Sequence, residues 1–383
     1  MPNSSLNLDA LSGELYEALL LAVDNPEQFR ATLDAIYPDM PAAERSTLGR
    51  LLPVMRERIA EPRNRWGRLG PYAPGGPGMG NAVGAARHVL GLFDPAGGAV
   101  GVGAAVSIPD VGGRLLKSAL AVDGSFGVPG EARFRPLRPE DLTATHLDAK
   151  AGVIAFFSVP IMGVKPRRVA SIVPRIRDIL EFLKEYRPPP FPGPVDLALA
   201  ADGERLFADR CGSCHGEYSS IPDVRLQRYP NVVVPIEYVG TDPTRWQAAE
   251  PALAAAIQQS AAGHLLAVGP TAGYLPPPLT GLWATAPYLH NGSVPTLWHM
   301  MHPELRPARF QVGGHRLDFE RLGIDGETAS DGIYRYPDGY QPWSTPFVFD
   351  TALPGQSNRG HEKPFRDLSE AEKRALLEYL KLL

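Results

Sequence analysis

The chain has two cysteines, and both lie in the segment Cys211-Gly-Ser-Cys214-His215. A Cys-x-x-Cys pair can form a disulfide, supply half of a zinc site or act as a redox dithiol. A histidine directly after the second cysteine is instead typical of the attachment site of c-type haem. No second cysteine pair completes a zinc site, and no βαβ pattern of a thioredoxin-like fold surrounds the motif. The motif therefore favours haem.

The spacing of the motif suits the chemistry of haem attachment. The thiols of Cys211 and Cys214 can add to the two vinyl groups of one porphyrin, and the adjacent His215 can then coordinate the iron from one face. We therefore predict one covalently attached haem c, with His215 as an iron ligand.

The composition argues against several other classes of protein. The 383 residues carry 38 Lys+Arg against 42 Asp+Glu, a net charge of −4, so the chain has no basic field to attract nucleic acid. No apolar run approaches the roughly 20 residues of a membrane-spanning helix, so we expect no transmembrane segment. The 39 glycines and 40 prolines predict many loops and turns.

Helical periodicity and proline-rich segments predict the organisation of the chain. We expect a helical and loop-rich N-terminal domain over residues 1–187, because apolar residues recur there at helical spacing. Residues 188–195 are rich in proline, cannot continue a helix and predict a linker to a second domain over residues 196–383. The expected helices cover residues 8–22, 42–58, 81–92, 141–157, 169–186, 196–209 and 245–260, with others that begin near Pro26 and after the capping box of Ser369 and Glu372.

The segment DGERLFADRCGSCHG, residues 202–216, resembles the start of a cytochrome c domain. In such domains a first helix with a glycine and an aromatic residue crosses the last helix. The resemblance assigns Gly203 and Phe207 to the first helix and residues 376–380 to the last. It implies a mainly α fold, in which a cytochrome c-type haem domain with long loop insertions follows the helical N-terminal domain.

A longer stretch, YLPPPLTGLWATAPYLHNGSVPTL at residues 274–297, resembles the bacterial di-haem cytochrome c peroxidase superfamily, and within it the rubber-oxygenase-like c-type cytochromes. The segment SNRGHE at residues 357–362 points to the same branch. These relatives carry two haem motifs, whereas this sequence has one. We expect the chain to be truncated at its N terminus; the alternative is a mono-haem protein whose first haem domain has lost its cofactor.

In cytochrome c domains the second axial ligand lies in the loop before the last helix, so the resemblance makes His361, in a glycine-flanked loop there, the candidate for this ligand; it could instead be a solvated loop histidine. The alternatives are Met300, Met301 and His302, since peroxidase relatives use a methionine after this motif. His290 lies within the motif, and we expect it beside the haem rather than on the iron. The aromatic residues Trp283 and Tyr288 could line the haem pocket or simply pack in the core. The arginines Arg210 and Arg245 could pair with the haem carboxylates or lie at the surface.

Two histidine ligands would close the iron to O₂ and peroxide, which suits electron transfer. We therefore predict an exported c-type cytochrome, periplasmic or secreted, because haem c is attached outside the cytoplasm. Its partner would be a redox protein or a second haem domain. The alternative is a di-haem peroxidase- or oxygenase-like oxidoreductase in which this chain holds the electron-transfer haem.

Overall fold

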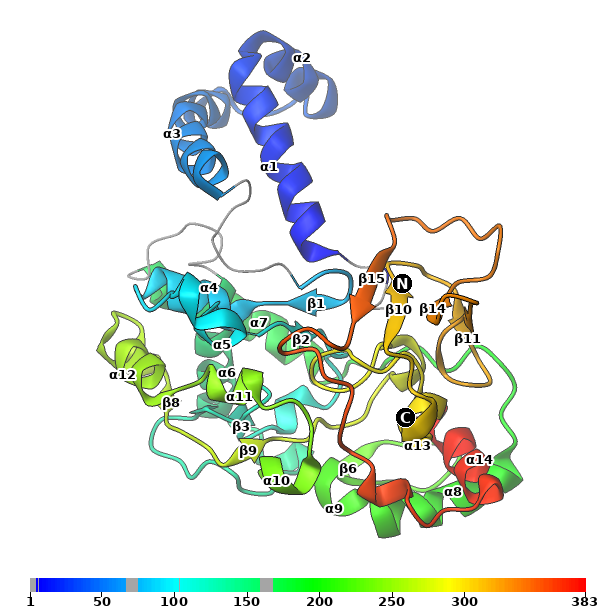
Figure 1. Cartoon of the computed structure of the whole chain (residues 1–383). Helices are drawn as coiled ribbons and strands as arrows, with labels where there is room; N and C mark the ends of the chain where they lie inside the picture. Colours follow the sequence, from blue (N-terminus) through cyan, green and yellow to red (C-terminus); the bar gives the residue numbers. More distant parts are fainter. Residues whose placement is uncertain (1–4, 6, 67–74, 103, 159–167) are drawn as a thin grey trace.

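The computed structural model describes residues 5, 7–66, 75–102, 104–158 and 168–383. Helices dominate, and the strands between them are short. Helices α1–α3 form a group that extends away from the rest of the molecule (Figure 1). The helices are α1 (Leu8–Asp24), α2 (Pro26–Ile36), α3 (Ala42–Trp66), α4 (Ala82–Val89), α5 (Gly98–Val102), α6 (Ala144–Ser158), α7 (Val169–Leu183), α8 (Leu197–Arg210), α9 (Gly212–His215), α10 (Ile236–Val239), α11 (Thr244–Gln247), α12 (Pro251–Gln259), α13 (Leu297–Met301) and α14 (Glu370–Leu380). No helix in the described ranges is long and apolar enough to cross a membrane.

The expected helices are present, with small shifts at their ends. The helix expected over 245–260 is divided into α11 and α12 because Pro251 starts a new helix at its first position. The capping box predicted at the start of α14 is confirmed: the Ser369 side chain accepts from the Glu372 backbone, and the Glu372 side chain accepts from the Ser369 backbone.

The strands form small sheets within the loop-rich parts of the chain. The largest sheet has four strands in the order β13-β14-β10-β15, with β10 parallel to β14 and antiparallel to β15. A three-stranded sheet, β3-β4-β8, joins the two halves of the sequence. The strands are β1 (Met79–Gly80), β2 (Val106–Ser107), β3 (Ala119–Leu120), β4 (Phe126–Gly127), β5 (Glu217–Tyr218), β6 (Leu226–Arg228), β7 (Val234–Pro235), β8 (Ala267–Val268), β9 (Gly273–Tyr274), β10 (Arg309–Val312), β11 (Leu317–Asp318), β12 (Gly323–Ile324), β13 (Glu327–Thr328), β14 (Ile333–Arg335) and β15 (Phe347–Asp350).

The two largest hydrophobic cores draw on different parts of the sequence. One contains buried residues from α8, α13, α14 and the four-stranded sheet, and all of its members follow the proline-rich segment 188–195. The other combines α4, α6 and α7 with residues 248–268 from the C-terminal half. The buried Arg87 also pairs with Glu250 at 2.8 Å. The domain boundary at 188–195 stays a prediction, and the N-terminal core is completed by residues beyond it.

Helices α8 and α14 cross at a glycine, as the resemblance to cytochrome c domains implies. A Cβ atom added to Gly203 would lie 2.0 Å from the carbonyl oxygen of Ala375. Beside this contact the rings of Phe207 and Tyr379 pack with their centroids 5.2 Å apart. The crossing fixes the end of α8, and the Cys211–His215 motif follows directly after that end.

Replacement of Gly203 by alanine should force α8 and α14 apart. We expect Gly203→Ala to lower the free energy of unfolding by about 3 kcal/mol, the upper range for an overpacked core, as measured by denaturant unfolding. Gly49→Ala is the matched control, because no atom lies within 4 Å of a Cβ at this helical position. Equal stability of the two variants would contradict the close crossing.

Candidate haem-binding site

The two cysteines and the histidine of the motif line one cavity of about 330 Å³. The single turn of α9 holds Cys214 and His215, and Cys211 caps this turn at its N-terminal end. Both cysteines are free thiols. Burial, together with the neighbouring Cys214, raises the pKa of Cys211 to about 12, so the Cys211 thiol is protonated at neutral pH. The motif therefore presents two reduced thiols and an imidazole to the same space.

His215 has a fixed orientation and a free ring nitrogen. Its Nδ1 lies 2.8 Å from the carbonyl oxygen of Pro277, which can only accept a hydrogen bond. Nδ1 must therefore carry the proton, and Nε2 keeps an unshared electron pair. Burial lowers the pKa of His215, which keeps the imidazole neutral. A neutral imidazole held through its second nitrogen is the usual form of a metal-ligating histidine.

His361 lies across the cavity from His215. The centroids of the two rings are 6.0 Å apart, with an angle of 62° between the ring planes. Two metal–nitrogen bonds of about 2 Å each, plus the distance from each nitrogen to its ring centre, give about 6 Å. Burial, with a smaller effect of His215, lowers the pKa of His361 to about 3, so this imidazole is also neutral. The two rings are therefore spaced to hold one metal ion between them.

The backbone around His361 brings the ring to this place. His361 has a left-handed conformation with φ of +57°, and its N–H donates to the carbonyl of Val239 at 2.7 Å. The preceding Gly360 also has a positive φ, and a Cβ there would lie 2.4 Å from the backbone of Gly240 and Thr241. Only glycine permits this close approach of two loops.

Arg306 holds the loop that carries His361. Its guanidinium donates to the carbonyls of Asn358 and Gly360, at 2.6 and 3.0 Å, and to those of His299 and Met300 on α13, at 3.1 and 2.9 Å. The Arg306 side chain is 2% exposed, so these charge-assisted hydrogen bonds are shielded from water. Arg306 thus ties the loop to the helix beside the cavity.

Residues 286–293, part of the segment that resembles the peroxidase superfamily, hold residues 355–357 at the start of the loop that carries His361. Asn291 donates through Nδ2 to the carbonyls of Gly355 and Ser357, at 3.2 and 2.9 Å. The Ser293 hydroxyl donates to Asn291 Oδ1 at 2.7 Å and also lies 3.0 Å from the carbonyl of Ser357. The Asp242 carboxylate accepts from the Ser357 backbone at 3.2 Å. The polar residues of this motif therefore position the His361 loop, a role that sequence reasoning did not assign to them.

His290 and Tyr288 line the cavity, as expected. The ring of His290 packs on that of Tyr274 with the centroids 4.2 Å apart, and its buried Nε2 has no hydrogen-bond partner within the described part of the chain. Burial lowers the pKa of His290 to about 4 and keeps the ring neutral. The Tyr288 hydroxyl donates to the carbonyl of Leu282 at 2.9 Å, which leaves its ring as part of the wall.

Trp283 and His302 lie outside the cavity wall. The indole of Trp283 donates to the carbonyl of Pro189 at 3.0 Å and packs against Phe191 and Phe319, so it anchors the proline-rich segment. This arrangement matches the core role that the sequence left open for Trp283. His302 donates through Nδ1 to the carbonyl of Trp298 at 2.7 Å, and its Nε2 lies 3.1 Å from the Glu370 carboxylate oxygens, so its ring nitrogens are engaged away from the cavity.

The rest of the wall is mostly apolar, which suits a porphyrin. It includes two of the three alternative ligands, Met300 and Met301, which are buried. The further apolar lining residues come from both halves of the sequence and are Val122, Leu275, Pro276, Leu279, Leu282, Leu297, Phe365, Leu376 and Leu380. The two thiols, the facing imidazoles and the apolar wall together fit a haem.

Of the two arginines considered for the haem carboxylates, Arg245 is engaged elsewhere and Arg210 lines the cavity. Arg245 forms a buried ion pair with Asp123 at 2.9 Å, and Arg210 pairs with Asp209 at the same distance. The cavity also contains two basic residues from the N-terminal half, Arg114 and Lys117, which sequence reasoning missed. No local pattern marks them, because they reach the site only through the tertiary fold.

Comparison with known proteins agrees with this geometry. The profile of the family described as "RoxA-like, cytochrome c-like" matches residues 273–311, which carry Pro277, His290 and Arg306. Over this segment the chain is similar to the rubber-oxygenase-like c-type cytochromes. As a cytochrome c-like family, these relatives imply haem c as the cofactor.

Two curated relatives, both from Sinorhizobium fredii, match a larger part of the chain. The protein printed as "Uncharacterized protein y4iJ" is 30% identical over 262 residues, which cover 51% of this chain and 41% of that protein. The protein printed as "Uncharacterized protein y4iM" is 28% identical over 222 residues, which cover 48% of this chain and 46% of that protein. The chain thus matches less than half the length of these relatives.

Removal of the Arg306 guanidinium should loosen the His361 loop. We expect Arg306→Met to lower the free energy of unfolding by roughly 3 kcal/mol, because buried carbonyls lose a charged donor. Amide exchange at residues 355–361 should become faster. Arg309→Met is the matched control, since Arg309 makes one 3.4 Å hydrogen bond to Asp331 at the surface. Equal amide exchange in both variants would show that Arg306 does not hold the loop.

Proposed function

We propose that this chain is a c-type cytochrome domain that transfers electrons through one haem. Thioether bonds from Cys211 and Cys214 would hold the porphyrin, and His215 and His361 would be the two axial ligands of the iron. The observation that supports this most directly is the 6.0 Å separation of the two neutral imidazole rings across the cavity that both thiols line.

The bound haem would supply a one-electron iron couple. The chain's own residues would keep both axial positions filled: the Pro277 carbonyl orients His215, and the braced loop orients His361. A filled sixth position leaves no place for O₂ or peroxide, so the site favours electron transfer over catalysis at this iron. The largely apolar wall would limit the approach of water to the iron.

A second candidate is the electron-transfer part of a larger peroxidase- or oxygenase-like oxidoreductase. It is favoured by the match to the RoxA-like profile, and the chain matches less than half of each curated relative. The haem proposed here would then pass electrons to a second haem domain rather than to a separate redox protein. Both versions place the protein outside the cytoplasm, in the periplasm or secreted, because haem c is attached there.

Loss of both thiols should abolish covalent attachment. We expect the double variant Cys211→Ala, Cys214→Ala to carry no haem that survives denaturation, as judged by haem staining after a denaturing gel. Ser213→Ala, between the two cysteines, should keep the stain at the wild-type level. Haem that remains covalently bound in the double variant would overturn the assignment of the thiols.

Removal of the His361 imidazole should open the iron. We expect His361→Gly, chosen because glycine tolerates the positive φ at this position, to convert the ferric haem from low-spin to high-spin in optical and EPR spectra. Met300→Leu, which alters the alternative ligand in the same wall, should stay low-spin. A low-spin spectrum for His361→Gly together with a high-spin spectrum for Met300→Leu would make Met300 the axial ligand.

A further inference from the structure

Two basic side chains reach the cavity from the segment between Asp110 and Val122, in the N-terminal half. Lys117 is 6% exposed, and its ammonium donates to the carbonyl of Ala121 at 3.1 Å. Within the described residues it forms no ion pair. Burial lowers the pKa of Lys117 to about 7, which reflects the cost of a charge without a counter-ion.

Arg114 is in a similar position. Its Nε donates to the backbone carbonyl of Asp110 at 2.8 Å, and no carboxylate among the described residues lies within ion-pair distance of its guanidinium. The Asp110 carboxylate instead accepts from neutral donors: the Tyr186 hydroxyl at 2.9 Å, the Gly112 backbone at 2.7 Å and the Thr280 hydroxyl at 3.1 Å. Burial lowers the pKa of Arg114 to about 10.

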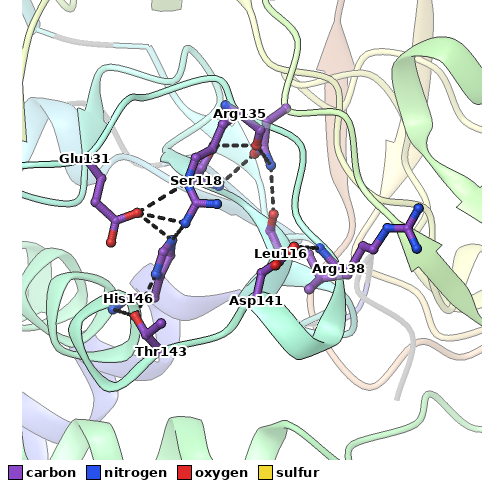
Figure 2. A network of polar contacts seen from close by, with 9 residues as sticks. Leu116, Ser118, Glu131, Arg135, Arg138, Asp141, Thr143 and His146 are labelled. Carbon is purple, nitrogen blue, oxygen red and sulfur yellow. Dashed lines mark hydrogen bonds and ion pairs between the residues drawn. The ribbon is translucent and has the colours of Figure 1, made fainter.

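The backbone on both sides of Lys117 is held rigidly. The buried Asn231 accepts from the Ser118 backbone at 2.7 Å and donates to the Leu116 carbonyl at 2.9 Å. The Ser118 hydroxyl donates to the Arg135 carbonyl at 3.1 Å. The Arg135 guanidinium in turn donates to the Glu131 carboxylate at 2.8 Å and lies 3.0 Å from Nε2 of the fully buried His146 (Figure 2). The network fixes the segment, so Lys117 cannot easily withdraw from the cavity.

A buried cation is expensive unless an anion accompanies it. Here the buried Lys117 and the partly buried Arg114 line the same cavity, whereas Arg210 and Arg245 already have carboxylate partners. Among the described residues, the buried hydroxyl of Thr241, which also lines the cavity, has no hydrogen-bond partner. Neither Lys117 nor Arg114 forms an ion pair with a carboxylate of the described residues.

We propose that Arg114 and Lys117 form an anion-binding subsite that receives the carboxylates of the haem. This inference rests on the proposed function. The planar guanidinium of Arg114 can bind a carboxylate through two parallel hydrogen bonds, and Lys117 contributes a compact positive charge. The N-terminal half is then part of the haem site and not a separate unit beside it.

The subsite should also influence the iron. A nearby cation disfavours the ferric state, which carries one more positive charge than the ferrous state, so it raises the reduction potential. We therefore expect Lys117→Met and Arg114→Gln each to shift the midpoint potential of the matured protein to a lower value. Covalent haem and the low-spin spectrum should be retained. Lys117→Arg should stay near the wild-type potential, because it keeps the charge.

Lys150→Met is the matched control. Lys150 is also a buried lysine without a hydrogen-bond partner, and burial likewise lowers its pKa to about 7, but it does not line the cavity. Its removal tests whether the loss of any buried charge in the N-terminal half lowers the midpoint potential. We expect Lys150→Met to shift the potential less than Lys117→Met does.

The outcomes separate this inference from the proposed function. Wild-type protein without covalent haem would overturn both. Haem-loaded variants with the wild-type potential, or a Lys150→Met shift as large as that of Lys117→Met, would overturn the subsite alone. A wild-type potential that depends on acetate concentration at constant ionic strength would assign the subsite to a free anion and overturn the haem assignment. If Arg114→Gln fails to fold, the midpoint potentials of Lys117→Met and Lys117→Arg still show whether the positive charge at residue 117 acts on the iron.

Discussion

The opposition of the His215 and His361 rings depends on the single helical turn α9, which ends at His215, and on the irregular loop that carries His361. His215 is oriented by one hydrogen bond to the Pro277 carbonyl, and His361 by a left-handed backbone conformation. The His361 conformation is not stable in isolation, because a residue other than glycine with positive φ is strained. The surrounding hydrogen bonds must compensate for this strain, and the buried guanidinium of Arg306 provides several of them.

The two halves of the chain contribute different things to the cavity. The C-terminal half supplies the thiols, both imidazoles and most of the apolar wall, all built on the crossing of α8 and α14. The N-terminal half supplies Arg114 and Lys117, and its core is completed by residues 248–268. In the haem-bound protein, folding and cofactor binding are therefore linked, because any group that binds only the folded state stabilises it.

Local patterns in the sequence predicted what depends on near neighbours along the chain. The haem motif and the capping box at Ser369 are of this kind, whereas the glycine at the helix crossing was implied by the resemblance to cytochrome c domains. The sheet β13-β14-β10-β15 was not predicted, because strands of two to four residues between glycines and prolines leave no alternation to detect. Arg114 and Lys117 were missed because the burial of a cation is set by tertiary packing. The spacing of the two rings likewise requires coordinates.

The ferric spin state of the matured wild-type protein tests the central claim most directly. It can be measured by EPR and optical spectra, before and after addition of peroxide. Two imidazole ligands predict a low-spin signal that peroxide does not change, since no axial position is open. A high-spin signal that peroxide converts to a ferryl species would contradict the account. It would show an open iron and would move His361 from the iron to the wall of a catalytic pocket.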